Sequence, residues 1–209
     1  MGEKSCLKEK RVERSLDGHD SCIVYSSKTG NTQKVALALA KATSLPLFSV
    51  NESPSIDEYS TLILGFWVRR AMPDEDMLRF LESVNHKNIF FFCTHAAWPD
   101  SAHIQNCIAN VRSLLCDRHN TVLGYFTCQG AVHGSSHKHP LTPERRMLLA
   151  EAARHPNKED YDNVIHACVC SLQRARVCYT PGGKDFPLSP CPPSPCFQHP
   201  AHSMINAEV

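Results

Sequence analysis

The 209-residue sequence has no excess of charge of one sign and no long apolar run. Twenty-two lysine and arginine residues stand against 21 acidic residues, which gives a formal net charge of +1. This balance argues against a general nucleic-acid binder, which carries a strongly basic surface. The apolar run at 89–93 (IFFFC) is far shorter than the roughly 18 residues that a membrane-spanning helix needs. We therefore expect no nucleic-acid partner and no membrane insertion.

A secretory signal and a regular cysteine framework are also missing. The first 20 residues contain five basic and five acidic residues and no apolar segment, so we expect no signal peptide. The 11 cysteines are scattered without a paired spacing, and their odd number leaves at least one thiol unpaired. These observations predict a cytoplasmic protein with reduced thiols.

The sequence does contain short apolar runs that alternate with amphipathic stretches. With 42% hydrophobic residues, the chain can build the core of one medium-sized domain. Alternation of this kind is typical of β/α units around a parallel sheet. The pattern predicts five strands, at 22–25, 46–50, 61–65, 88–94 and 121–128.

Helices are predicted after most of these strands and beyond the last one. They fall at about 33–44, 74–84, 99–116, 144–155 and 157–174. The polar stretch at 51–60 is too short for a crossover helix with two loops, so we expect a thin connection there. We divide the chain into a charged extension at 1–19, a domain at 20–175 and a tail at 176–209. Seven prolines in residues 181–200 predict that the tail is extended or disordered.

The segment with the clearest chemistry is SSKTGNT at 26–32, between the first strand and its helix. A loop in this place can direct backbone N–H groups, hydroxyls and the positive end of a helix at one anion. The order of its residues is neither that of a Walker loop (GxxxxGK[ST]) nor that of a dinucleotide fingerprint (GxGxxG). The segment predicts a phosphate site, and a simple glycine-containing turn is the alternative.

The run IVYSSKTGNTQKVALAL at 23–39 resembles the signature of the flavodoxin family, in which this loop surrounds the phosphate of FMN. The resemblance extends over 20–128 and the helix at 157–174. It implies an α/β, three-layer flavodoxin-like fold with a five-stranded parallel sheet in the order 2-1-3-4-5. The chain is similar to short-chain members and, in its extra segment at 129–156, to a bacterial subgroup of the family. That segment is expected either to cover the flavin edge or to dock a partner.

The resemblance places cofactor-binding residues in three segments. The phosphate loop is expected to contribute Ser26, Ser27, Lys28, Thr29, Gly30, Asn31 and Thr32. Two further loops should follow the third and fourth strands, and their contributions are Phe66, Trp67, Val68, Thr94, His95, Ala97 and Trp98. Trp98 falls where short-chain flavodoxins have a tryptophan stacked on the flavin. Trp67 or Phe66 would approach the other side of the ring.

Three charged or titratable residues beside the expected flavin suggest further hypotheses. Arg69 and Arg70 would favour a reduced, anionic flavin and so raise its potential, or they are solvated or face an acidic partner. His95 would donate a hydrogen bond to a flavin oxygen or to N5, or it is a surface residue. We predict no metal site, although His133, His137 and His139 lie close together in the sequence.

The function implied by the resemblance is electron transfer through FMN, to or from a partner protein that is a reductase or an acceptor enzyme. An NAD(P)H-dependent flavin or quinone reductase is a second reading, for which the sequence shows no nicotinamide motif. A non-catalytic binding module with a flavodoxin-like fold is a third reading, which the intact loop disfavours. An electron carrier is favoured over a stand-alone oxidoreductase.

Overall fold

The computed structural model describes residues 20–52, 54–132 and 141–178. Its strands are β1 (Ser21–Tyr25), β2 (Leu47–Ser49), β3 (Thr61–Arg69), β4 (Met72–Pro73), β5 (Asn88–His95) and β6 (Thr121–Gln129). Its helices are α2 (Asn31–Thr43), the 3₁₀ helix η1 (Val50–Glu52), α3 (Glu75–Leu81), α4 (Ala102–Cys116), α5 (Pro143–Ala152) and α6 (Lys158–Cys178).

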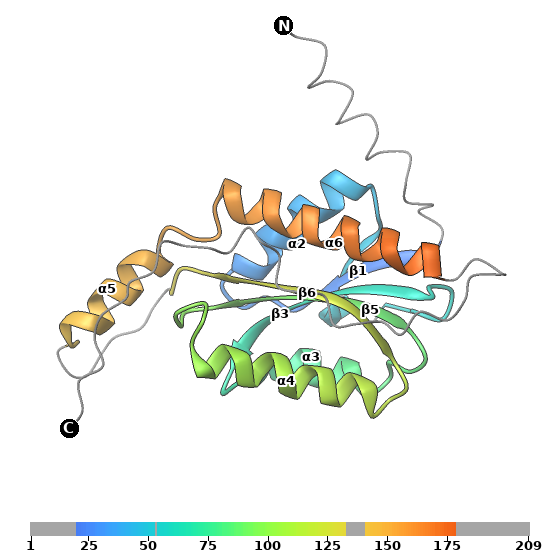
Figure 1. Cartoon of the computed structure of the whole chain (residues 1–209), viewed down its shortest axis with the longest axis horizontal. Helices are drawn as coiled ribbons and strands as arrows, with labels where there is room; N and C mark the ends of the chain where they lie inside the picture. Colours follow the sequence, from blue (N-terminus) through green and yellow to red (C-terminus); the bar gives the residue numbers. More distant parts are fainter. Residues whose placement is uncertain (1–19, 53, 133–140, 179–209) are drawn as a thin grey trace, which may run out of the picture.

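Five parallel strands form the sheet in the order β2-β1-β3-β5-β6. Helices α2 and α6 cover one face and α3 and α4 cover the other (Figure 1). The three layers and the strand order confirm the predicted fold. The chain moves outward from β1 to β2, then crosses back to β3 on the other side of β1. The carboxyl ends of strands at such a reversal are the usual ligand-binding edge of an open α/β sheet.

Side chains of each strand alternate between two cores. Ile23 of β1 and Phe92 of β5 pack in the cluster that includes residues of α2 and α6, and both are fully buried. Val24 and Phe91 pack in the cluster on the α3 and α4 side, and both are also fully buried. Burial on both faces explains why these strands have nearly continuous apolar sequences.

The third strand is longer than predicted. It was expected to end at residue 65, but it continues to Arg69 and returns through Arg70 and Ala71, which have positive φ angles of 52° and 58°, into the antiparallel strand β4. Glycine often ends a strand, whereas Gly65 lies inside this one. A Cβ atom at Gly65 would be 2.2 Å from Cζ of Phe92, so the missing side chain makes room for that ring.

Helix boundaries agree with the predictions to within four residues. Helix α3 ends at Leu81 rather than near 84, because Ser83 N and Val84 N donate to carbonyls three residues back instead of four. Asn157 precedes the first residue of α6 and caps its start. Its Oδ1 accepts from Glu159 N at 2.9 Å, and its own N–H donates to Asp160 Oδ2 at 2.8 Å.

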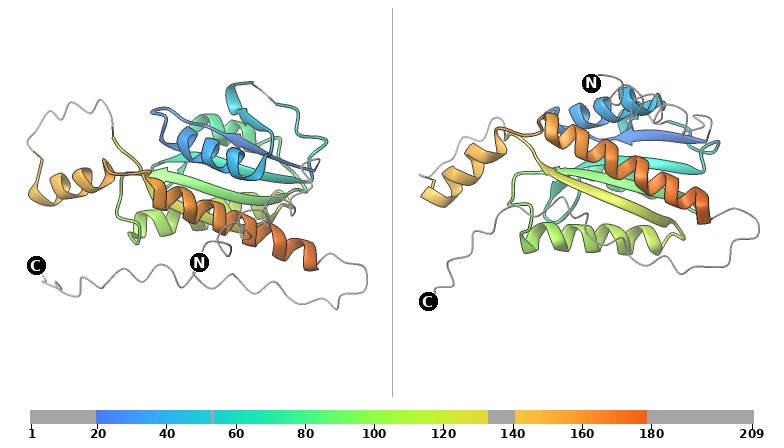
Figure 2. Two further views of the ribbon diagram at one scale, coloured as in Figure 1. Left: turned by 90° about the horizontal axis from the view of Figure 1, so that it is seen from above. Right: turned by 45° about the horizontal axis from the view of Figure 1, so that its top comes forward.

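Two features lie outside the central sheet. Helix α5 projects from the body of the molecule, and it precedes α6 in the chain (Figure 2). Between β2 and β3 the described residues contain only η1, which confirms the predicted thin connection.

No helix in the described part of the chain is both long and apolar enough to cross a bilayer. The expected N-terminal extension, His133, His137, His139 and nearly all of the tail lie outside the described residues.

Replacing Gly65 by alanine should destabilise the fold by about 2 kcal/mol, because the new methyl group would overlap the buried Phe92 ring. Urea unfolding of the purified variant measures this loss. The matched test is the same substitution in a Phe92→Leu background, where the ring is absent and the added cost should fall below about 1 kcal/mol. Equal costs in both backgrounds would contradict this account of Gly65.

Candidate functional site

The loop at 26–30 connects the carboxyl end of β1 to the start of α2. Its last residue, Gly30, is the N-cap and has a φ angle of 88°, a left-handed conformation that glycine adopts without strain. Gly30 N donates to Ser27 Oγ at 3.2 Å. The backbone N–H groups of 27–29 and 31–33 have no acceptor among the described residues. These N–H groups, together with the positive end of α2, provide donors for an anion.

Ser26 lies at the base of this loop and has no donor left for a ligand. Its N–H donates to Gly65 O at 2.8 Å, and its Oγ donates to Asp74 Oδ1 at 2.6 Å. Ser26 and Asp74 are both buried. Its two donors fasten the loop to β3 and to the start of α3. The expected direct contact of Ser26 with the cofactor stays a prediction.

The beginning of α2 is fastened to two other strand ends. Thr32 Oγ1 lies 2.9 Å from Thr94 Oγ1 of β5, and both residues are buried. Asn31 Nδ2 donates to Ala131 O, beyond β6, at 2.7 Å. A Cβ atom at Gly130 would lie 2.7 Å from Asn31 Nδ2, so glycine permits this close approach. Thr32, Thr94 and Asn31 thus hold the loop in place.

Thr29 and Lys28 are the exposed members of the loop. Thr29 Oγ1 accepts from Asn31 Nδ2 at 3.3 Å, so its hydroxyl hydrogen remains available. Lys28 Nζ lies 5.9 Å from the centroid of the Trp67 ring, a distance at which a cation and an aromatic face attract. The loop therefore presents hydroxyls to solvent and places its cation over Trp67.

The segment that contains Trp67 is part of β3 and not the predicted loop. Trp67 is half-buried, and Arg69, two residues further and thus on the same side of the strand, forms an ion pair with Glu75 of α3. Phe66 and Val68 face the opposite side. Phe66 is 1% exposed and stacks on Phe91 with ring centroids 6.0 Å apart.

Phe66 is therefore a core residue, which corrects its assignment as a flavin contact. Val68 packs against the same core from a half-buried position and pairs with Pro73 of the β3–β4 hairpin. Of the three residues predicted from this segment, only Trp67 faces the side on which Lys28 lies.

A loop that begins after β5 presents the second tryptophan. Trp98 is 46% exposed, a large apolar surface in contact with solvent. The carbonyl of Ala97 beside it accepts from Gln129 Nε2 at 3.0 Å and from His95 Nδ1 at 3.1 Å. Gly130 N donates to His95 O at 2.9 Å. The ends of β5 and β6 thus fix the loop that holds Trp98.

His95 is buried, and burial lowers the pKa of its imidazole from the usual 6.5 to about 4, although the bond to Ala97 opposes this shift. His103 and His155 lower the pKa further. The ring is therefore neutral at pH 7, and the nitrogen that faces the Ala97 carbonyl must bear the hydrogen. Its Nε2 is then an acceptor, and this atom is buried without a partner in the described residues. In this tautomer Nε2 can accept a hydrogen bond but cannot donate one, and the expected contact of His95 with the flavin stays a prediction.

The lowered pKa of His95 predicts a pH dependence of stability. Below about pH 6.5 the His95 imidazole is protonated in the unfolded chain, whereas in the folded chain it stays neutral down to about pH 4. The free energy of unfolding therefore decreases as the pH falls through this window. Between about pH 8 and about pH 5 this group should remove about 2 kcal/mol from the free energy of unfolding. Urea unfolding at both pH values should show a smaller loss in His95→Gln. The exposed neighbour provides the control His103→Gln, and an equal pH effect in all three proteins would contradict the assignment.

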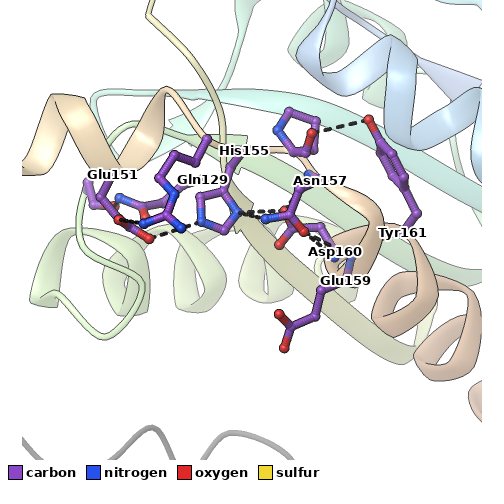
Figure 3. Close-up of polar contacts among 10 residues, drawn as sticks. Gln129, Glu151, His155, Asn157, Glu159, Asp160 and Tyr161 are labelled. Atoms are coloured by element: carbon purple, nitrogen blue, oxygen red, sulfur yellow. Dashed lines mark hydrogen bonds and ion pairs between the residues drawn. The ribbon is translucent and has the colours of Figure 1, made fainter.

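The segment beyond β6 joins this site to the helices α5 and α6 (Figure 3). Ala131 N donates to His155 O at 3.0 Å. The His155 ring lies between two carboxylates, with Nδ1 2.6 Å from Asp160 Oδ2 and Nε2 3.5 Å from Glu151 Oε1. Since Ala131 also accepts from Asn31, the extra segment predicted at 129–156 is connected directly to the loop.

Two residues of this edge were not identified from the sequence. Asp74 precedes an apolar helical pattern, which is the signal of an N-cap, but its bond to a loop 48 residues earlier has no local signal. Gln129 is the last residue of β6, and only its position at the carboxyl edge could have indicated a role. Both act through contacts between segments that are distant in the sequence.

Three of the buried cysteines have raised pKa values. Burial raises the pKa of Cys22 and Cys168 to about 12 in each case, and it raises the pKa of Cys128 well above its usual value. These thiols remain protonated at pH 7 and act as apolar core residues. Among the described residues, no group of three or more histidine, cysteine or acidic side chains is arranged to hold a metal ion.

Comparisons with known proteins give the following matches. A family model described as a flavodoxin domain matches residues 22–168. The flavodoxin-like domain-containing protein BilS of Clostridioides difficile (strain CD3) is 26% identical over 152 residues, which are 68% of this chain and 86% of that protein.

Solved structures also align with the chain. Oxidised flavodoxin 1 from Bacillus cereus is 17% identical, with a TM-score of 0.43, over 66% of this chain and 99% of that one. The Trp repressor binding protein from Bacillus subtilis is 12% identical, with a TM-score of 0.47, over 66% of this chain and 99% of that one.

Proposed function

We propose that this chain, which belongs to the flavodoxin domain family, binds FMN non-covalently and exchanges electrons with a partner redox protein. The observation on which the proposal depends is the loop at 26–30. It lies at the carboxyl end of β1, and no described residue accepts a hydrogen bond from its N–H groups at 27–29 or from the hydroxyl hydrogens of Ser27 and Thr29. Family membership makes FMN the ligand that this loop is best suited to hold.

The phosphate would be held mainly by neutral groups. Six backbone N–H groups, at 27–29 and 31–33, and the hydroxyls of Ser27 and Thr29 surround the start of α2. They are fixed in advance by the bonds of Ser26 and Thr32, so little conformational entropy is lost when an anion binds. Preorganised dipoles of this kind stabilise a phosphate without a cluster of cations.

The two tryptophans would hold the flavin ring. Trp67 lies at the end of β3 and Trp98 follows the end of β5, two strands that are neighbours in the sheet. A flat aromatic ligand in contact with Trp98 would cover apolar surface that is now 46% exposed. The Ala97 carbonyl, held by Gln129 and His95, keeps this tryptophan in position.

When bound, FMN would supply the electron-transfer chemistry, and the chain would supply binding, orientation and the polarity of the site. The partner is expected to meet the exposed edge beside Trp98 and the segment at 129–156. Because the formal net charge is only +1, partner choice would depend on local contacts rather than on long-range electrostatic steering. We place this exchange in the cytoplasm.

The role of the loop is tested by comparing FMN with riboflavin, which lacks the phosphate. Ser27→Ala removes one hydroxyl and the acceptor for Gly30 N, so it should weaken FMN binding about tenfold and change riboflavin binding less than about twofold. Quenching of flavin fluorescence gives both dissociation constants. Ser113→Ala, an exposed serine on α4, is the control and should change neither. Equal affinities of the unsubstituted chain for FMN and riboflavin would contradict a phosphate site in this loop.

A further inference from the structure

Asp74 has an unusual arrangement of hydrogen bonds for a buried carboxyl group. Asp74 is only 1% exposed to solvent. All of its described donors converge on one oxygen, Oδ1: Ser26 Oγ at 2.6 Å, Asp76 N at 3.2 Å and Met77 N at 3.3 Å. The second oxygen, Oδ2, is buried without a partner in the described part of the chain.

A buried carboxyl oxygen without a donor is energetically costly, so such atoms in folded proteins are nearly always paired with a protein group, a water or a ligand. The N-cap role of Asp74 does not explain the second oxygen, because Oδ1 alone caps α3. A hydrogen-bond donor to Oδ2 must therefore come from outside the described residues. A dianionic phosphate has no hydrogen to donate and would be repelled by a carboxylate.

The position of Asp74 limits which part of a ligand it meets. Its other oxygen accepts from Ser26, the residue at which the phosphate loop begins, so the carboxyl group of Asp74 lies at the base of that loop. In FMN the phosphate is attached to a ribityl chain, whose hydroxyl groups are hydrogen-bond donors. The hydroxyl groups of this chain are the donors that such a ligand has next to its phosphate.

We infer that Asp74 Oδ2 accepts a hydrogen bond from a ribityl hydroxyl and so makes the site selective for flavins that have this chain. The inference rests on the proposed FMN site and assigns a specificity-determining residue within it. The same carboxyl group would thus join three parts of the site: the base of the phosphate loop through Ser26, the start of α3 through its cap, and the sugar chain of the ligand.

The test compares riboflavin with lumiflavin, which has a methyl group in place of the ribityl chain. Asp74→Asn keeps a good N-cap and an acceptor for Ser26 but replaces the unpartnered oxygen by an amide. Riboflavin binding should weaken about tenfold, and lumiflavin binding should change less than about twofold. Asp76→Asn, two residues away in an exposed ion pair with Arg79, is the control and should change the binding of neither ligand. Circular dichroism and thermal unfolding verify that each variant is folded.

Other results overturn the inference in distinguishable ways. An equal loss for riboflavin and lumiflavin would show that Asp74 only supports the local structure. Unchanged binding of both would show that a water satisfies Oδ2. Absence of any flavin binding by the unsubstituted chain would overturn both this inference and the proposed function. Flavin binding with no effect of Asp74 on selectivity would overturn this inference alone.

Discussion

The parallel pairing of β1 with β2 on one side and with β3 on the other determines where the candidate site lies. In register, Tyr25 at the end of β1 lies beside Ser49 and Gly65, and the next residue begins the loop at 26–30. Because the five strands of the order β2-β1-β3-β5-β6 are parallel, their carboxyl ends meet at one edge. The loop, Trp67, His95 and Gln129 come together there although they are spread over about half of the chain.

Buried polar bonds between elements then fix the shape of this edge. Ser26 is joined to Asp74, Thr32 to Thr94, and Gln129 to the carbonyl of Ala97. In a low-dielectric surrounding each such bond is strong, and the loss of one partner would leave the other group unsatisfied. The loop is consequently held before any ligand arrives, which is the condition for tight binding by neutral donors.

The strands and the loop could be predicted from the sequence because each has a local signal: apolar runs, an alanine-rich helix and a hydroxyl- and glycine-rich turn. The order of the strands has no such signal and was predicted only through the resemblance to the flavodoxin family. The length of β3 could not, since Gly65 suggests an end where the Phe92 ring in fact requires a glycine. The burial of His95 and the bond from Ser26 to Asp74 arise from packing between distant segments. Residue type and spacing contain no information about such contacts.

The most direct test is an anaerobic titration of the purified chain after incubation with FMN. The account predicts one bound FMN per chain, reduced by dithionite and left oxidised when NAD(P)H is added alone, since a carrier needs a partner reductase. Rapid reduction by NAD(P)H without any other protein would contradict the electron-carrier role. A chain that retains no FMN would contradict the central claim that the loop at 26–30 and the tryptophans form a flavin site.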